Sequence, residues 1–460
     1  SGTLTATGGA SAGIVDSGNV AVAGNVTLTT DAGNGVINMG TLQQSAGDLI
    51  LVTNGSGAAT VVNNAGIDFG TSNVGGALSA TASAGNITQN GGAITVAGTS
   101  SFILGANSAN VVLDHASNAF SGAVTLLAGA GGSQAFGNVT FVDDSAVKID
   151  ANADAAGDLY LNAGTDGAVG GNLAVTATTG NITQGVAVAV TGTSAFTTSA
   201  SDATITLGTT TNALGGTVAF TTAGTAGNVV IDNGTTGLDL AASTINGTLT
   251  ATGGATAGIV DSGNVAVAGN VTLTTDAGNG VINMGTLQQS AGDLILVTNG
   301  NGAATVVNNA AIDFGTSNVG GALDVTASAG TITQNGGALT VAGTSAFTTS
   351  TNDQAITLSN TTNALTGAVA FTTGGTTGNV VIDNGTTGLD LAASTISGTL
   401  TATGGASAGI VDSGNVAVAG NVTLTTDAGN GVINMGTFQQ SAGDLILVTN
   451  GNGAATVVNN

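Results

Sequence analysis

Long internal repeats constrain this 460-residue sequence more than any other feature. Residues 2–64, 247–309 and 398–460 are almost the same sequence. They differ at only three positions, which are Ser11/Thr256/Ser407, Leu42/Leu287/Phe438 and Ser56/Asn301/Asn452. Duplication on this scale is typical of repeat architectures, in which each unit buries its apolar face against its neighbours.

The spacing of the copies predicts how the chain is organised. The second and third copies start 151 residues apart and the first and second 245 apart, so the first unit holds about 94 additional residues. We expect one continuous array over residues 1–460, with repeat units 2–246, 247–397 and, in part, 398–460. The extra residues form a diverged copy near 103–196.

A shorter motif, Gly-x-Φ-x-Φ with Φ apolar, lies beneath the long repeat. Alternation of apolar and polar residues, bounded by Gly and Asn, is the signal for short half-buried strands. In the first part of the chain the motif begins at Gly2, Gly24, Gly47, Gly76, Gly92, Gly122, Gly137, Gly157 and Gly171. These starts are about 21 residues apart on average, which suggests the coils of a solenoid.

Composition supports an all-β fold. The chain has 78 Gly and no Pro, and all 25 acidic residues are Asp. Long helices draw on Glu, Lys and Arg, which are nearly absent, and Pro would remove N–H groups from ladders that run from coil to coil. We therefore predict a parallel β-helix (β-solenoid) built from internal repeats, with about 21 residues per coil. An antiparallel sandwich is the structural alternative.

Charge narrows the range of partners. The net charge is −24 and Lys148 is the only Lys or Arg, so nothing can neutralise phosphates or anionic lipid surfaces. No run of 18 apolar residues is present. We expect no nucleic-acid partner and no membrane insertion in this segment.

A resemblance to a known class of proteins adds to this interpretation. Residues 171–177 (GNLAVTA), followed by 180–184 (GNITQ) and 192–196 (GTSAF), resemble the repeats of large bacterial surface proteins of the filamentous-haemagglutinin and adhesin type. The resemblance covers essentially the whole chain. It implies a secreted, right-handed parallel β-helix in a surface fibre or stalk, and it carries no functional residues across.

Acidic side chains are the candidate site residues. The densest group is Asp143, Asp144, Asp150, Asp154 and Asp158, with Asp166 beyond it, and a second set recurs in identical corners at Asp31, Asp276 and Asp427. Oxygen-rich turns of this kind hold Ca²⁺, which makes calcium the candidate cofactor. Asp at turns also bonds to nearby backbone N–H groups, and the sequence leaves both interpretations open.

Catalysis finds little support. His115 is the only histidine, and aligning the internal copies places Thr209 and Asn360 at its position, so we interpret it as a turn variant. β-Helix enzymes that cleave acidic polysaccharides share this scaffold, yet such sites need cations that this chain lacks. We predict that the protein is not an enzyme, with a polysaccharide-degrading β-helix enzyme as the remote alternative.

Function is then expected to be mechanical. We predict a structural protein of an extracellular or cell-surface filament that assembles with itself, end to end or laterally. Exposed ladder groups on terminal coils would join copies end to end. The alternative is an adhesin whose solenoid surface attaches to cells, host or matrix.

Overall fold

The computed structural model describes residues 2–129, 134–163 and 167–460. These residues divide into two compact units, Ser1–Asn233 and Gly234–Asn460, and each unit is described by itself. All regular elements of the described residues are β-strands. No helix in the described ranges is long and apolar enough to cross a membrane.

The first unit contains strands β1 to β26, most of them two to eight residues long. Their bounds are β1 Leu4–Gly8, β2 Ile14–Val15, β3 Val20–Val22, β4 Val26–Thr30, β5 Ile37–Gln44, β6 Leu49–Val52, β7 Ala59–Asn63, β8 Ile67–Val74, β9 Leu78–Ala82, β10 Ile87–Val96, β11 Ser100–Leu104, β12 Val111–Leu113, β13 Ala119–Phe120, β14 Val124–Ala128, β15 Val139–Asp143, β16 Val147–Asp150, β17 Asp158–Asn162, β18 Ala168–Val169, β19 Leu173–Ala177, β20 Ile182–Gln184, β21 Ala189–Val190, β22 Ser194–Ser201, β23 Ile205–Leu207, β24 Ala213–Leu214, β25 Thr217–Ala223 and β26 Val229–Asp232.

The second unit contains strands β27 to β54. Their bounds are β27 Leu238–Leu240, β28 Ser243–Ile245, β29 Leu249–Gly253, β30 Ile259–Asp261, β31 Val265–Val267, β32 Val271–Thr275, β33 Ile282–Gln289, β34 Asp293–Val297, β35 Ala304–Asn308, β36 Ile312–Phe314, β37 Ser317–Val319, β38 Leu323–Ala327, β39 Ile332–Thr333, β40 Leu339–Val341, β41 Ser345–Asn352, β42 Ile356–Leu358, β43 Ala364–Leu365, β44 Val369–Gly374, β45 Val380–Asp383, β46 Leu389–Leu391, β47 Ser394–Ile396, β48 Leu400–Gly404, β49 Ile410–Asp412, β50 Val416–Val418, β51 Val422–Thr426, β52 Ile433–Gln440, β53 Leu445–Val448 and β54 Ala455–Asn459.

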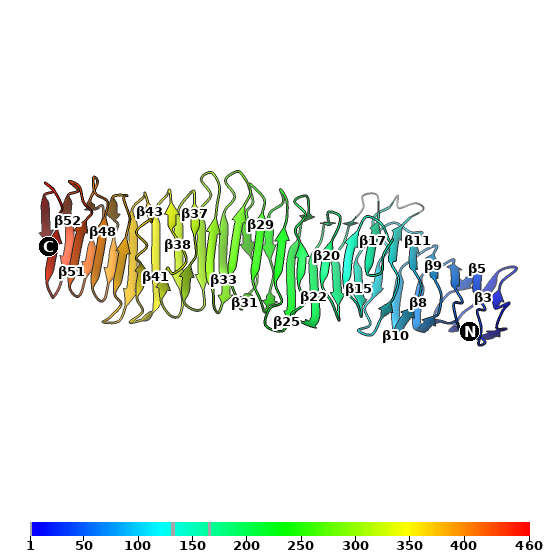
Figure 1. Ribbon diagram of the computed structural model, residues 1–460. Coiled ribbons are helices and arrows are strands. Elements are labelled where there is room, and N and C mark those ends of the chain that lie inside the picture. The colour runs from blue at the N-terminus through cyan, green and yellow to red at the C-terminus, as the bar shows by residue number, and fades with distance from the viewer. Residues whose placement is uncertain (1, 130–133, 164–166) are drawn as a thin grey trace. The chain divides into compact units, whose positions relative to one another are not determined.

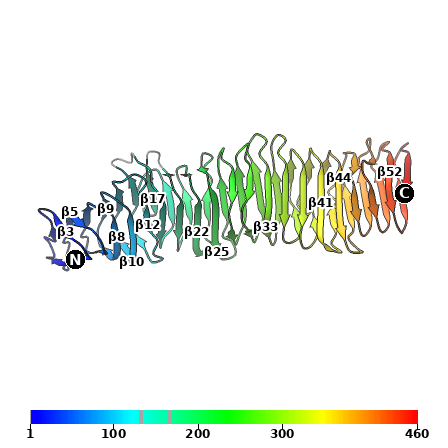
Figure 2. The ribbon, with the colours of Figure 1, turned by 180° about the vertical axis from the view of Figure 1, so that it is seen from behind.

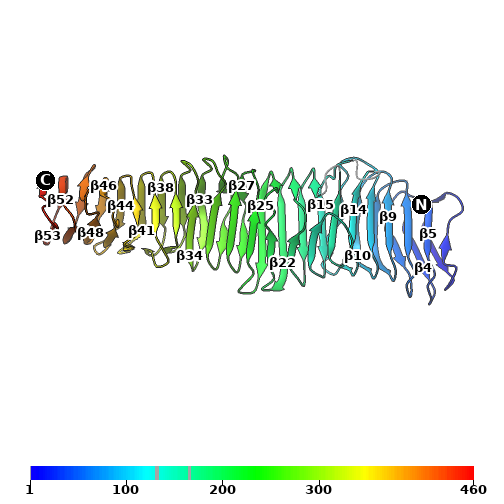
Figure 3. The ribbon, with the colours of Figure 1, turned by 45° about the horizontal axis from the view of Figure 1, so that its top comes forward.

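Coils of the first unit stack strand on strand, in register. Leu4 pairs with Val26 and Val26 pairs with Leu49, so one coil takes about 22 residues. Each coil also supplies strands to a second sheet, in which β7, β9 and β11 follow one another. Two further views show the strands of the first unit side by side (Figures 2 and 3). Both ladders are parallel, and the first unit is therefore a parallel β-solenoid.

Coils of the second unit follow the same plan (Figure 1). Leu249 pairs with Val271 and Val271 with Leu294, again in parallel. In the other sheet β38, β41 and β44 stack through Leu323, Ser345 and Val369. The second unit is also a parallel β-solenoid.

Apolar side chains alternate along each strand and fill the interior. In β4, Val26 and Leu28 are fully buried while Thr27 and Thr29 lie on the outer face. All eleven phenylalanines are fully buried, and four of them form a column in the first unit. Its ring centroids lie 5.5 to 5.9 Å apart along Phe69, Phe102, Phe120 and Phe141.

Corners between strands need residues that tolerate unusual backbone geometry. Gly13 and Gly258 sit at the same place in two copies with φ of 68° and 70°. A Cβ atom there would collide with the backbone carbonyl of Val36 or Val281 on the next coil. Only glycine fits such a position, which explains part of the high glycine content.

These observations confirm the fold prediction at the level of a parallel β-solenoid built from repeats. All nine Gly-x-Φ-x-Φ motifs begin strands or lie within them. The antiparallel sandwich is wrong, because the described ladders are parallel and the antiparallel bridges are isolated, at Gly9–Gly13 and Gly254–Gly258. Right-handedness and one continuous array over residues 1–460 stay predictions.

Candidate functional site

Asp143 is the most buried of the predicted calcium ligands. It ends strand β15 and is 2% exposed. Its Oδ1 accepts hydrogen bonds from the backbone N–H groups of Phe120 and Asp144, both at 2.9 Å, and its Oδ2 accepts from Ser145 Oγ at 2.7 Å. Burial raises the pKa of Asp143, and the neighbouring charge of Asp144 acts in the same direction.

Other copies of the repeat explain this arrangement. Where Asp143 accepts from Phe120 N–H, Asn233 Oδ1 accepts from Leu214 N–H and Asn384 Oδ1 from Leu365 N–H, both at 2.8 Å. Asp143 therefore occupies the place of a corner asparagine that binds the preceding coil. This supports the interpretation of Asp143 as a turn residue.

Two of the remaining carboxylates of the group, those of Asp150 and Asp158, are also engaged locally. Asp150 accepts from Ala151 N–H and forms an ion pair with Lys148, which lowers the pKa of Asp150. Asp158 is 3% exposed and accepts from the N–H groups of Ala155 at 2.8 Å and Asp154 at 3.3 Å. Asp144 is exposed.

A calcium site would need several of these carboxylates to point toward one ion. In the described ranges, no group of three or more His, Cys, Asp or Glu side chains is placed to hold a metal ion. Asp166 lies outside the described residues. Calcium at Asp143, Asp144, Asp150, Asp154 and Asp158 stays a prediction.

The repeated corners hold Asp31, Asp276 and Asp427. In each the backbone N–H donates to a glycine carbonyl of the preceding coil, at 2.9 to 3.0 Å. The side chains lie at the surface, exposed or partly exposed. Burial raises the pKa of Asp383, and the negative charge of Asp427 acts in the same direction.

A different recurring aspartate binds one coil to the next. Asp16, Asp261 and Asp412 each accept two backbone N–H bonds from a Gly-Thr pair on the following coil, and the threonine hydroxyl adds a third bond. For Asp261 the donors are Gly285 N at 2.7 Å and Thr286 N at 2.8 Å. These carboxylates accept hydrogen bonds from the following coil and so connect successive coils.

Sequence reasoning missed a pair of capping aspartates, Asp202 and Asp353, whose carboxylates accept hydrogen bonds from backbone N–H groups of the next coil. Asp202 and Asp353 adopt φ of 62°, a region that Asp tolerates better than most residues. Asp353 Oδ1 accepts from the N–H groups of Thr376 and Thr377 at 2.6 and 2.8 Å, and these bonds lower the pKa of Asp353. The signal available in the sequence was a turn-forming Ser-Asp or Asn-Asp pair.

His115 lies in a turn after β12. Its backbone N–H donates to Gln89 Oε1 at 3.3 Å, and its Nδ1 accepts from Ser117 N–H at 3.1 Å. Thr209 and Asn360 donate in the same way to Gln184 and Gln334. The equivalence predicted from the internal copies is therefore present in the structure.

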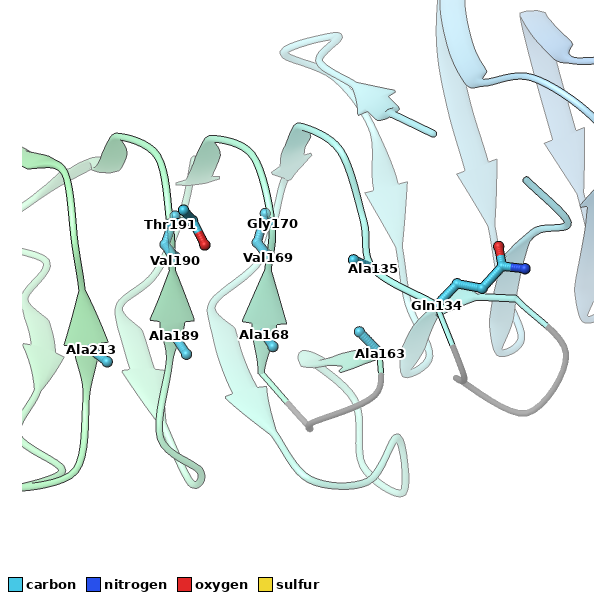
Figure 4. Close-up of a pocket in the computed structure, with 10 residues that line it drawn as sticks. All are labelled: Gln134, Ala135, Ala163, Ala168, Val169, Gly170, Ala189, Val190, Thr191 and Ala213. Atoms are coloured by element: carbon cyan, nitrogen blue, oxygen red, sulfur yellow. The ribbon is translucent and has the colours of Figure 1, made fainter. Parts of the chain in front are cut away.

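One pocket of about 500 Å³ opens on the first unit. Figure 4 shows Ala168, Ala189 and Ala213 on three neighbouring strands, β18, β21 and β24, which pair in register. The ten described lining residues include no ionisable side chain. The pocket therefore offers shape and apolar contact, with Gln134 and Thr191 as its polar side chains.

Comparisons with known proteins place the chain in a family. Neither the curated proteins nor the solved structures give a match. A family model described as repeats of unknown function (DUF5649) matches residues 56–127, 136–221, 226–301 and 300–372. These segments cover more than half of the chain, and the chain therefore belongs to the DUF5649 family of repeats of unknown function.

Proposed function

We propose that this protein is a structural component of an extracellular or cell-surface fibre, in which stacked β-solenoid coils form a rod or stalk that assembles with further copies of itself. The observation that carries the proposal is the use made of its polar residues. The recurring Asp16, Asp261 and Asp412 all bind the next coil. A chain whose repeated carboxylates hold its own coils together is suited to bearing load.

Charge and composition support a place outside the cell. A single Lys and no Arg leave trypsin-like proteases one site in 460 residues. Dense coil-to-coil hydrogen bonding also protects the backbone, because proteolysis needs local opening. The resemblance to surface fibres of the filamentous-haemagglutinin and adhesin type points the same way.

Attachment is the second candidate function. An adhesin needs surface features that contact a partner, and repetition would present the same feature several times along one chain. Two surface grooves in the second unit, one lined by Thr244, Ala266 and Gln288 and the other by Thr395, Ala417 and Gln439, favour this candidate.

Deleting one repeat tests the mechanical proposal. Removing residues 247–397 joins Asn246 to Gly398. Asn246 and Ser397 occupy equivalent positions in two copies of the repeat, so the new junction keeps the phase of the repeat. The shortened chain should fold, still form threads, and lose seven coils, or about 33 Å of length at ~4.8 Å per coil. Electron microscopy of negatively stained protein measures both thread formation and length.

A matched control removes residues 247–386, which breaks the phase of the repeat and should prevent folding of the second unit. The fibre proposal fails if the full chain forms no threads at any ionic strength. It also fails if the in-phase deletion leaves the particle length unchanged.

A further inference from the structure

Two surface grooves of the second unit share the same lining, one repeat apart. Their volumes are about 310 and 440 Å³. The first lies at the ends of β28, β31 and β33, and the second at the ends of β47, β50 and β52. The matched lining residues are Thr244/Thr395, Ala266/Ala417, Gln288/Gln439 and Ser290/Ser441.

Side-chain size explains why the surface is hollow here. Thr244, Ala266 and Gln288 pair in register on three successive coils. The side chain of the middle coil ends at Cβ, whereas its neighbours are longer. Since adjacent coils lie ~4.8 Å apart, the backbones of the flanking coils are about 10 Å apart, and the narrower space between their side chains forms a slot that runs parallel to the strands. Thr395, Ala417 and Gln439 form the same slot in the next copy.

The floor of the groove cannot accept an added strand. Ala268 N–H donates to Ile245 C=O at 2.9 Å and Ser290 N–H to Val267 C=O at 3.0 Å, so the backbone is already paired on both sides. Peptides that add to a sheet need an open edge. The side chains of Ile245 and Val267 are buried, so they offer no apolar anchor at the surface.

The charge of the protein and the neutral lining of the grooves exclude most other classes of ligand. No ionisable side chain lines either groove, and the only Lys of the sequence belongs to the first unit. A net charge of −24 repels acidic polymers, and a cation would need carboxylate ligands that the grooves lack.

Neutral hydrogen-bonding groups remain. The hydroxyl of Thr244 and the side-chain amides of Gln288 and Asn309 line the first groove. Within the described part of the chain, no hydrogen bond joins the side chains of Gln288 and Asn309 to protein groups. In the second groove the matching Gln439 Oε1 accepts from Asn415 Nδ2 at 3.2 Å. An amide offers two donors and an acceptor at one place, which complements the hydroxyl groups of a sugar.

We propose that each groove binds a short segment of a neutral polysaccharide, laid parallel to the strands over Ala266 or Ala417. The sugar hydroxyls bond to the threonine and glutamine side chains of the flanking coils. The proposal gives the attachment function its ligand class. It does not depend on fibre formation.

Repetition strengthens binding to long chains. The two grooves are seven coils apart, which is about 33 Å at ~4.8 Å per coil. A hexasaccharide occupies one groove, whereas a polymer engages both, and binding at a second linked site raises overall affinity by about 10²-fold or more. We therefore expect weak binding of oligosaccharides and at least tenfold tighter binding of the parent polymers.

The test measures binding of maltohexaose, xylohexaose and mannohexaose, and of the corresponding soluble polysaccharides, to the whole chain by calorimetry and affinity electrophoresis. The double variant Ala266→Leu/Ala417→Leu fills both slots and should lower affinity for at least one of these sugars at least tenfold. Either single variant should keep hexasaccharide binding and lose the advantage of the polymer. Gln288→Ala/Gln439→Ala, which leaves the slots open, should also weaken binding.

A matched control is Ala346→Leu/Ala370→Leu, on the outer face of β41 and β44 and outside both grooves. This control should bind sugar as the native chain does. The proposal is overturned if no neutral sugar binds at millimolar concentration, if filling both slots leaves binding unchanged, or if polygalacturonate binds equally well. Thread formation by the same variants is measured separately. If the native chain forms threads but binds no neutral sugar, the sugar-binding proposal fails and the fibre proposal stands.

Discussion

Gln334 and Asn363 hold each other by two hydrogen bonds inside the second unit. Gln334 Nε2 donates to Asn363 Oδ1 at 2.6 Å, and Asn363 Nδ2 donates to Gln334 Oε1 at 3.0 Å. Asn363 also accepts from Leu339 N–H at 2.8 Å and donates to Asp383 C=O at 3.0 Å. One buried amide thus joins several coils at a corner, and Gln89 with Asn118 repeats the reciprocal pair in the first unit.

Replacing Asn363 with alanine should destabilise the second unit. The change leaves the Leu339 N–H buried without its partner and removes both bonds to the Gln334 amide, which keeps only Gly337 C=O and Asn360 N–H. An unsatisfied buried group costs about 1 to 3 kcal/mol. We expect the free energy of unfolding, measured in urea, to fall by about 2 to 4 kcal/mol. Asn283→Ala, on the outer face of β33, is the matched control and should stay within about 0.5 kcal/mol of the native chain. A similar effect of both changes would contradict the role given to the amide pair.

Asp143 should make stability depend on pH in the opposite sense to the capping aspartates. Because its pKa is raised in the folded state, folding favours its protonated form, and stability rises as pH falls from neutral toward the ordinary Asp value of 3.8. Asp353 has a lowered pKa, so its contribution is present above 3.8 and is lost as pH falls below that value.

The variant Asp143→Asn tests this assignment. Asn occupies the equivalent position at 233 and 384, where its Nδ2 donates to the carbonyls of Leu214 and Leu365. We expect the free energy of unfolding at pH 7 to rise by about 1 kcal/mol, and its dependence on pH between 4 and 7 to weaken. Asp114→Asn, at an exposed position of the first unit, serves as the control. An unchanged pH profile in Asp143→Asn would refute the assignment.

Two buried serines should respond to alanine with opposite signs. Ser345 is 3% exposed between Leu323 and Val369, and in the described residues its hydroxyl has no hydrogen-bond partner. Ser394 is 5% exposed, but its hydroxyl donates to Ala392 C=O at 2.8 Å and accepts from Phe371 N–H at 3.0 Å.

Ser345→Ala therefore removes a polar group that folding leaves unsatisfied, whereas Ser394→Ala breaks two bonds. We expect the first change to raise the free energy of unfolding by about 1 kcal/mol and the second to lower it by about 1 to 3 kcal/mol. Urea denaturation of the two variants side by side decides the matter. A loss of stability in both would mean that the Ser345 hydroxyl has a partner.

The alternation of small apolar and polar residues was enough to predict most of the fold. A strand is predicted by Gly24-Asn25 followed by the alternating residues Val26, Thr27 and Leu28. The structure has this strand as β4, with Val26 and Leu28 buried. The motif starts are irregularly spaced because they belong to two sheets, yet the coil length of about 21 residues that they predict is close to the observed value of about 22. Gly24 precedes a strand of one ladder and Gly76 a strand of the other.

The polar corners could not be predicted in the same way. Asp143 appears in the sequence as one of a group of acidic residues, and only the paired coils show that it substitutes for Asn233 and Asn384. The grooves were missed for a related reason. Ala266 is unremarkable alone, and it becomes the floor of a slot only when Thr244 and Gln288 are stacked on either side of it.

Divalent cations should drive lateral association of copies of this protein. The net charge of −24 is spread along the repeats, including the surface corners at Asp31, Asp276 and Asp427, so copies repel one another at low ionic strength. Millimolar CaCl₂ should raise light scattering, and EDTA should reverse the rise. NaCl at equal ionic strength is the control and should act more weakly, since it only screens charge. Asp31→Asn/Asp276→Asn/Asp427→Asn should shift the effect to higher calcium concentration, and scattering that stays flat in calcium would show that these carboxylates do not bridge neighbouring copies.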